Sequence, residues 1–142
     1  MTLHIREFRE EDRDHVVALW SMCELTRPWN DPDADIDLAV RSREASLLVG
    51  LKQDEIMASI MVGHDGHRGW IYYLAVTPDH RSHGHGREMM AEAELWLQSR
   101  RIPKVHLMVR SGNTDAAEVY KALGYERQEV SVFGKWLGPE RS

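Results

Sequence analysis

The residues best suited to chemistry lie in the stretch TPDHRSHGHGREMM, residues 77–90, which holds two arginines, three histidines and two glycines. Gly84 and Gly86 stand where this stretch turns into a helical pattern. Glycine lets a backbone approach a ligand closely and adopt a positive φ. The first turn of a helix adds unpaired N–H groups and a positive dipole end. With Arg81 and Arg87 at its edge, the stretch therefore predicts an anion site suited to a pyrophosphate.

Two common phosphate-binding motifs do not fit this stretch. Gly84 and Gly86 are not followed by the Lys-Ser/Thr pair of a P-loop, so ATP hydrolysis is not expected. Counted from Gly84, the last glycine of a Gly-x-Gly-x-x-Gly motif is replaced by Met89. A dinucleotide-binding fold is therefore not expected either.

The histidines allow a second interpretation, in which His80, His83 and His85 bind zinc. A structural zinc site needs about four ligands at a recognisable spacing, and the single cysteine, Cys23, is distant in sequence. We therefore expect no metal, and we interpret the three histidines as part of an exposed loop near phosphates. A single cysteine also allows no intrachain disulfide.

The elements that must position this loop follow from hydrophobic periodicity. The first half of the chain predicts a strand in 2–8, helices in 12–25 and 34–43, and strands in 46–52 and 56–63. Prolines in 27–33 separate the two helices. In the second helix, Ile36 and Val40 are expected to face inward. The residues between the last two strands, Gln53-Asp54-Glu55, predict a hairpin turn.

The second half of the chain predicts a central strand, two helices and further strands. The central strand is 70–76, WIYYLAV, whose continuous apolar run indicates cover on both faces. The central strand is followed by a helix in 86–101 and a strand in 105–109. After these come a helix capped by Asn113 or Thr114 and ended by Gly124, and one or two strand segments in 126–137. Strands in runs between helical crossovers indicate a mixed sheet with helices on both faces. The length of 142 residues fits one domain, 1–142.

Two motifs resemble those of a known family. Val76-x-Pro78-x-x-Arg81-x-x-Gly84-x-Gly86, after an apolar strand, resembles the acetyl-CoA signature of the GNAT superfamily of N-acetyltransferases. The ending Asn113…Ala116-x-x-x-Tyr120-x-x-x-Gly124-Tyr125 is similar to the family's last helix, and the order of elements matches over nearly the whole chain. The stretches 27–32, 65–69 and 72–74 are similar to the YpeA-like branch in particular.

The resemblance implies a fold, a cofactor and site residues. The fold is the GNAT type, mixed α/β (α+β), with a mixed, mostly antiparallel sheet of six to seven strands flanked by about four helices. The cosubstrate is acetyl-CoA, and the reaction moves its acetyl group to a primary amine, either a small amine or a peptide N-terminus. The residues that the resemblance places at the cofactor are Leu74, Ala75, Val76, Arg81, Ser82, His83, Gly84, His85, Gly86, Arg87, Asn113, Ala116 and Tyr120.

Three roles in the chemistry follow from the same resemblance. Tyr120 matches the family's general acid, which protonates the leaving thiolate. Backbone groups of Leu74 and Val76 would contact the thioester carbonyl and its oxyanion. Asn113 would contact the arm of the cofactor or cap its helix.

The general base is not identified by the sequence. Some members of the family carry a glutamate near the start of the central strand, whereas this chain has Gly69-Trp70-Ile71-Tyr72 there. The remaining candidates are His64, Asp65, His67, Tyr73 and a chain of waters.

The acceptor site is expected between the first helical region and the end of the central strand. The stretch 29–37 combines Trp29 with Asp31, Asp33, Asp35 and Asp37, and we expect it to meet a cationic acceptor. The substrate residues predicted here are Trp29, Asp31, His67 and Tyr73.

Composition limits the possible partners. Eighteen basic and 23 acidic residues give a net charge of −5, which argues against a general nucleic-acid binder. The N-terminus has no apolar signal core and no apolar run approaches a membrane span, so we expect a cytoplasmic protein with no membrane partner. The apolar stretch 133–137, FGKWL, suggests a homodimer edge or packing in a last strand.

Two functional classes remain open at this level. The first is an acetyl-CoA-dependent N-acetyltransferase, which Tyr120 favours. The second is a non-catalytic module of the same fold that senses CoA or an amine, which the missing glutamate favours. Release of free CoA in the presence of an amine distinguishes the two.

Overall fold

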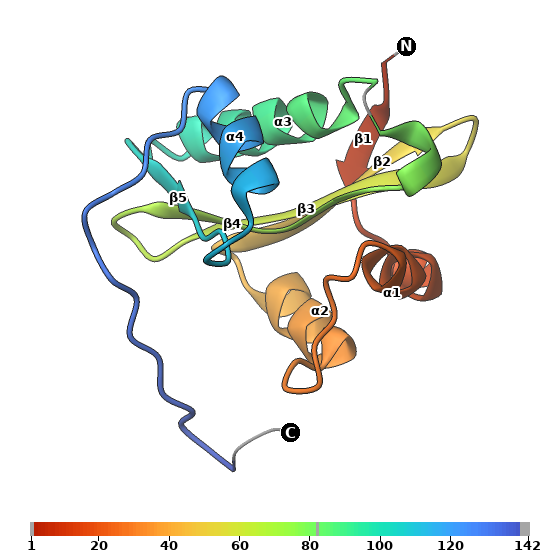
Figure 1. Cartoon of the computed structure of the whole chain (residues 1–142). Coiled ribbons are helices and arrows are strands. Elements are labelled where there is room, and N and C mark those ends of the chain that lie inside the picture. Colours follow the sequence, from red (N-terminus) through yellow and green to blue (C-terminus); the bar gives the residue numbers. More distant parts are fainter. Residues whose placement is uncertain (1, 82, 140–142) are drawn as a thin grey trace.

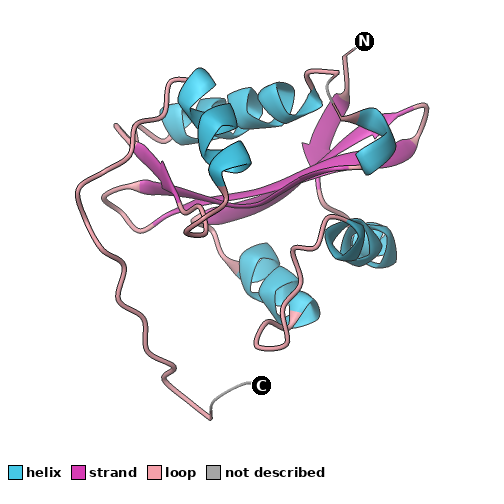
Figure 2. Cartoon of the chain, viewed as in Figure 1, coloured by secondary structure: helices cyan, strands magenta, loops and turns pink. Residues whose placement is uncertain are grey.

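The computed structural model describes residues 2–81 and 83–139, which form one mixed sheet with helices on both of its faces (Figures 1 and 2). The five strands lie in the order β1-β2-β3-β4-β5. In chain order the elements are β1 (His4–Glu7), the 3₁₀ helix η1 (Glu10–Asp12), α1 (Arg13–Met22), α2 (Pro32–Arg41), β2 (Ala45–Lys52), β3 (Glu55–His64), β4 (Gly69–Val76), the 3₁₀ helix η2 (Pro78–His80), α3 (His85–Ser99), β5 (Val105–Leu107) and α4 (Thr114–Ala122).

The sheet changes direction at its last strand. Strands β1 to β4 pair antiparallel, and β5 pairs parallel to β4. The β4–β5 pairing is short: it begins at Gly69↔Val105 and ends at Ile71↔Leu107. Beyond Ile71, β4 therefore has a neighbouring strand on its β3 side only, within the part of the chain that the structure describes.

Each face of the sheet carries its own apolar cluster. On the face covered by α3, Met89, Met90, Ala93 and Leu97 pack with residues of β3 such as Ile60. On the opposite face, the α1 and α2 side chains pack against β2 and β4. The members of this second cluster are Val16, Leu19, Trp20, Ile36, Leu47, Val49 and Ala75. Because successive strand residues point to opposite faces, β4 contributes Ala75 to one cluster while Leu74 and Val76 contact the other.

The predicted helices and the hairpin are confirmed, with local corrections. Pro32 does not precede α2 but occupies its first turn, where its missing N–H costs no helical hydrogen bond. In α2 the inward pair is Ile36 and Ala39, and the prediction for Val40 is wrong because its side chain is 53% exposed. Gln53 and Asp54 both have positive φ, 52° and 65°, as a two-residue hairpin turn requires.

The predicted number of strands, six to seven, is wrong for the described residues. No strand lies within residues 126–139, which run away from the rest of the domain (Figure 1). Alternating apolar residues form a strand only where a neighbouring backbone takes up its hydrogen bonds, and no described segment does so here. Phe133 and Leu137 are accordingly 94% and 95% exposed.

None of the helices in the described ranges is long and apolar enough to cross a membrane.

Candidate active site

A bulge in β4 sets the geometry of the candidate site. Ser59 pairs with Ala75 and Met61 pairs with Tyr72, so β4 has one residue more than β3 between these two pairs. Tyr73 lies in the bulge with φ of 52°, a conformation that is uncommon for a residue other than glycine. Its carbonyl accepts a hydrogen bond of 2.9 Å from the Ser59 hydroxyl.

The C-terminal half of β4 presents backbone groups at an open edge. The amide of Thr77 donates to the Met57 carbonyl, so by the alternation of an antiparallel ladder the groups of Val76 point away from β3. The Val76 carbonyl accepts from Arg81 Nε and Cys23 Sγ, each at 3.3 Å. By the same alternation the backbone groups of Ala75, which pairs with Ser59, face β3, so the amide of Val76 is a donor directed at the open edge.

The loop after β4 forms the N-terminus of α3. Gly84 precedes the helix with φ of 80°, a left-handed conformation that glycine adopts without strain. The Glu88 amide is the first to donate within the helix, to the Gly84 carbonyl at 3.1 Å. No described residue accepts a hydrogen bond from the amides of His85, Gly86 and Arg87, so these amides are left for an external acceptor. A Cβ at Gly84 would meet no atom within 4 Å, so the space beside Gly84 itself is open.

The side chains of this loop divide into exposed and buried groups. Arg81, His83 and Arg87 are exposed and can reach an anion at the loop. His85 is only 2% exposed and its Nδ1 lies 3.1 Å from Glu88 Oε2, so its side chain points into the protein and it offers the loop only its amide. Ser82 lies outside the described residues.

The three loop histidines lie near one another without forming a metal centre. The ring centroids of His80, His83 and His85 are separated by 6.3, 6.5 and 6.0 Å. Within residues 2–81 and 83–139, no group of three or more His, Cys, Asp or Glu is arranged to hold a metal ion.

The start of α4 lies after β5 and is fixed by a side-chain cap. Asn113 Oδ1 accepts from the Ala116 amide at 3.2 Å, so the side chain of Asn113 is used as a helix cap. The Ala116 side chain is half-buried one turn into the helix. Of the two roles predicted for Asn113, a contact with the cofactor arm or a helix cap, the structure shows the helix cap.

Tyr120 lies further along α4 and packs against the α3-side cluster. Its ring meets the edge of the Tyr125 ring at a centroid distance of 6.0 Å. Burial raises the pKa of Tyr120, because the phenolate would lose its hydration. Its hydroxyl has no hydrogen-bond partner among the described residues, whereas Tyr125 donates to Glu94 Oε2 at 2.7 Å.

The three base candidates before β4 lie at the wrong end of the strand. His64, Asp65 and His67 precede Gly69, and Gly69 is about 13 Å from Tyr73 along the strand at about 3.3 Å per residue. Asp65 Oδ1 accepts the amides of Arg68 and His67, and these bonds hold the pKa of Asp65 below its usual value. His67, also predicted to contact the substrate, is exposed in this same turn and is not brought to the bulge.

Tyr73, in contrast, makes a defined polar contact on the α1–α2 face. Its hydroxyl donates to Asp35 Oδ2 at 2.7 Å. Its ring stacks on Trp20 with centroids 3.7 Å apart, and Trp20 Nε1 donates to the Ser59 hydroxyl at 2.8 Å. Burial, together with the bond to Asp35, raises the pKa of Tyr73.

The acidic stretch 29–37 serves several separate purposes. Asp31 Oδ1 caps α2 by accepting from the Ala34 amide at 3.2 Å. Asp33 and Asp37 form ion pairs with Arg13 of α1 at 3.1 and 2.6 Å. Among the four aspartates, this leaves Asp35 as the one directed at β4.

Trp29 connects the acceptor side to the loop after β5. The Arg110 guanidinium carbon lies 5.6 Å from the centroid of the Trp29 ring, a cation–π distance. Trp29 itself is 40% exposed. The loops 27–31 and 108–113 therefore meet at this contact.

Sequence reasoning missed how Asp35, Trp20 and Ser59 come together around Tyr73. The spacing of the aspartates could have predicted part of this arrangement. Asp33 and Asp37 are four residues apart and therefore share one face of the helix, and Asp31 and Asp35 are also four residues apart. The contact of Trp20 with Tyr73 had no such signal, since it depends on how α1 lies across the sheet.

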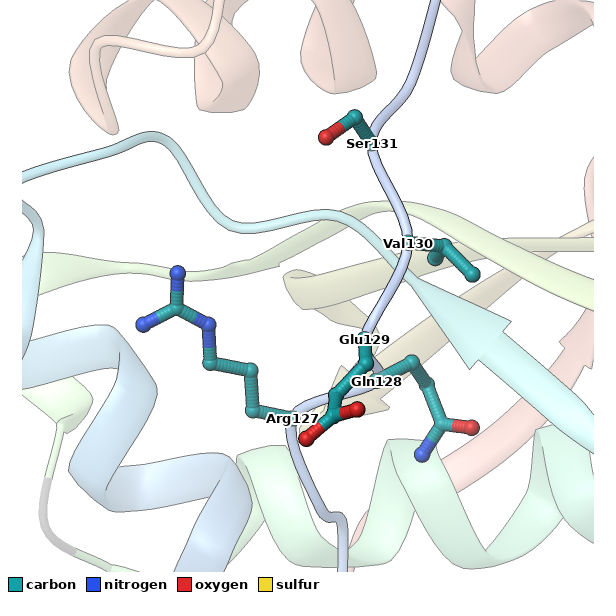
Figure 3. A pocket seen from close by; sticks show the side chains of 5 residues that line it. All are labelled: Arg127, Gln128, Glu129, Val130 and Ser131. Atoms are coloured by element: carbon teal, nitrogen blue, oxygen red, sulfur yellow. The ribbon is translucent and has the colours of Figure 1, made fainter.

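One pocket lies outside this site. Its lining consists of five consecutive residues of the C-terminal segment, Arg127, Gln128, Glu129, Val130 and Ser131. Figure 3 shows these side chains on a single extended stretch of backbone. A pocket lined by one segment brings together no catalytic groups from different elements, so we assign no site to it.

Comparison with known proteins points to a single family. Residues 6–125 match the model of the acetyltransferase (GNAT) family. An acetyltransferase of Pectobacterium atrosepticum is 41% identical over 139 residues, covering 98% of this chain and 99% of that protein. An acetyltransferase of Sodalis glossinidius is 42% identical over 136 residues, covering 95% and 96%.

Solved structures share the fold at low sequence identity. The aminoglycoside acetyltransferase AAC(6')-Iy, in complex with a bisubstrate analogue of CoA and acetylneamine, matches with a TM-score of 0.81 at 16% identity, covering 96% of this chain and 99% of that one. A ribosomal-protein-alanine N-acetyltransferase of Brucella melitensis matches with a TM-score of 0.75 at 15% identity, covering 96% and 100%.

Proposed function

The chain belongs to the acetyltransferase (GNAT) family, whose cosubstrate is acetyl-CoA, and from this premise we propose that it is an N-acetyltransferase acting on a primary amine. The observation that carries the proposal is the junction of β4 and α3. There, in the part of the chain that the structure describes, an unpaired strand edge, a left-handed Gly84 and three unused helix amides occur together. This combination suits a ligand with a long hydrogen-bonding arm and a doubly anionic group.

The cofactor site that we propose follows from this junction. The pyrophosphate lies on the amides of His85, Gly86 and Arg87, with Arg81 and Arg87 supplying charge. The amide arm of acetyl-CoA runs along the open edge of β4 and extends the sheet locally, on the side that faces α4. Ser82, His83 and Ala75 complete the set at the loop and strand, and Asn113 and Ala116 border the arm from α4.

The proposed reaction is direct attack of the amine nitrogen on the thioester carbonyl carbon. The amine first loses one proton, since an ammonium has no lone pair for the attack. The developing oxyanion is stabilised by the amide of Val76 or Leu74. The C–S bond then breaks, Tyr120 donates its proton to the CoA sulfur, and the second proton of the nitrogen leaves through solvent, which restores Tyr120. The products are an amide, CoA thiol and one proton.

The acceptor side of the proposal rests on the α1–α2 face. Trp29, Asp31 and Tyr73 border the region where an amine can reach the bulge of β4. Structural neighbours include an enzyme bound to an aminoglycoside analogue, and its acceptor class is cationic. We propose that the acceptor of the present chain is likewise a cationic amine.

We also propose that the chain belongs to the YpeA-like branch of the family, on the basis of the stretches 27–32, 65–69 and 72–74.

Release of CoA thiol from acetyl-CoA tests this function. The wild-type chain is incubated with acetyl-CoA and a panel of primary amines, and free thiol is followed with a chromogenic disulfide. We expect thiol release that depends on both the amine and the enzyme. Binding of acetyl-CoA without release by any amine would instead support the alternative, a module that senses CoA or an amine.

We also propose a homodimer formed through the C-terminal segment. Val130, Val132, Phe133 and Leu137 are all more than two-thirds exposed, and β5 has an open outer edge in the described part of the chain. An extended apolar segment and an open strand edge suit one another, so two copies can exchange these segments. Light scattering should give twice the mass of the chain, and a monomer at micromolar concentration would contradict the dimer.

A further inference from the structure

The β4 bulge and α2 together define where the acceptor's charge is held. We propose that Asp35, oriented by Tyr73, binds the cationic amine of the acceptor and thereby determines that the substrate is positively charged. This inference rests on the proposed function, because it concerns the second substrate of that reaction. The sequence predicts that the stretch 29–37 as a whole meets a cationic acceptor, and this inference assigns that contact to the carboxylate of Asp35 alone.

The hydrogen-bond partners of the four aspartates single out Asp35. Asp31 is used as a helix cap, and Asp33 and Asp37 are neutralised by Arg13. Asp35 is half-buried, while the other three are exposed. An ion pair that is partly shielded from water is stronger than one on the open surface, so Asp35 is the aspartate best able to hold a cation.

The carboxylate of Asp35 has one oxygen fixed and one oxygen free. Oδ2 accepts from the Tyr73 hydroxyl at 2.7 Å. Oδ1 accepts no hydrogen bond from any of the described residues, and it is not among their buried unpaired atoms, so it is open to solvent. Arg13, the basic residue of α1 that faces α2, is engaged by Glu10, Asp33 and Asp37. An ammonium at Oδ1 would therefore compensate a negative charge that the described part of the protein leaves without a counter-ion.

Tyr73 is held rigidly enough to orient this carboxylate. Trp20 stacks on its ring at 3.7 Å with an interplanar angle of 8°, and Ser59 binds its carbonyl. The strained φ of 52° is kept by these contacts, and strain of this kind concentrates at functional positions. Tyr73 belongs to the bulge of β4 and packs on the α1–α2 side, so the Asp35 carboxylate that its hydroxyl binds lies on the face of the sheet where the acceptor is proposed to enter.

The test measures amine binding without turnover. Protein saturated with CoA is titrated with spermidine, neamine and alanine amide, three cationic primary amines of different size, and heat is recorded. Asp35→Asn should weaken binding of the tightest probe by at least about tenfold, because it removes a charged partner. Asp37→Asn makes the same change of net charge on the same helix and should stay within about twofold. In Tyr73→Phe the loss of amine affinity should lie between the losses in these two variants, because the Asp35 carboxylate is kept but no longer held by the tyrosine hydroxyl.

Several outcomes would overturn the inference. Equal losses in Asp35→Asn and Asp37→Asn would mean that amines respond only to the general negative field of α2. Failure of all three probes to bind the wild-type complex would also reject it. The proposed function fails by a different result, namely absence of thiol release from a chain that still binds acetyl-CoA, so the two failures are distinguishable.

Discussion

The hydroxyl of Tyr120 is the group that the proposed mechanism requires to donate a proton to sulfur. Packing against the α3-side cluster holds the ring, and burial keeps the phenol neutral. A group with a raised pKa stays protonated to higher pH, so the proton remains available well above neutrality. Tyr125 is a natural control, since it is a neighbouring tyrosine whose hydroxyl is already bonded to Glu94.

Tyr120→Phe should lower kcat by about 100-fold or more, the usual range for loss of a general acid. Binding of acetyl-CoA should be unchanged within about twofold, because a phenyl ring fills the same volume. Tyr125→Phe should retain activity and lose about 1 kcal/mol of unfolding free energy with its hydrogen bond. Steady-state kinetics and calorimetry measure both quantities. Equal activity of the two variants would remove Tyr120 from the mechanism.

The raised pKa of Tyr120 also predicts that the wild-type kcat does not fall between pH 7 and pH 9 through deprotonation of this acid. A fall of kcat over that range, caused by loss of the Tyr120 proton, would contradict the raised pKa.

At the scale of elements, α3 supports the loop that we place at the cofactor. This helix lies close to the sheet because glycines occupy the points of closest approach. A Cβ at Gly69 would lie 2.5 Å from Leu97 Cδ1 and 3.2 Å from Leu97 Cγ, and Leu97 is itself only 3% exposed. Room for the added methyl would require the buried Leu97 side chain to repack or α3 to move from β4.

Gly69→Ala should therefore lower the free energy of unfolding by about 1–3 kcal/mol, the usual cost of overpacking a core. In Gly86→Ala the nearest contact of the new Cβ would be Val76 Cγ2 at 4.0 Å, an ordinary van der Waals distance. That variant should be as stable as the wild type, or slightly more stable, because alanine favours a helix. Thermal unfolding of both variants measures the difference. Equal midpoints would show that α3 does not depend on the close approach at Gly69.

At the scale of the whole molecule, the proposed sites of the two substrates lie on opposite faces of one strand, β4. Leu74 and Val76 contact the α3 side, while Tyr73 and Ala75 contact the α1–α2 side. The short pairing with β5 leaves the strand edge between them open. Cofactor and acceptor can therefore meet at the bulge of β4 without either one crossing a packed layer.

How far the sequence predicts this arrangement depends on the range of the interactions. Local signals located α3, its left-handed Gly84 and the cap at Asn113, because each depends on residues within one turn. The pairing of Asp35 with Tyr73 depends on how α2 lies against the sheet, which no local pattern specifies. One or two strand segments were predicted in 126–137, but the described chain offers this segment no strand partner.

The proposed position of the acetyl-CoA pyrophosphate on the loop before α3 underlies the proposed reaction, and calorimetric titration tests it. Wild type, Gly84→Glu and Gly66→Glu are each titrated with acetyl-CoA. Gly84 and Gly66 both have positive φ, 80° and 84°, and a Cβ at either position would meet no atom within 4 Å. Both variants therefore carry a similar backbone cost, and only Gly84→Glu places a carboxylate beside the helix amides.

We expect wild type and Gly66→Glu to bind alike, and Gly84→Glu to bind at least about 100-fold more weakly because like charges meet at the loop. Unchanged binding in a folded Gly84→Glu variant would contradict this placement, since the pyrophosphate would then have to lie elsewhere.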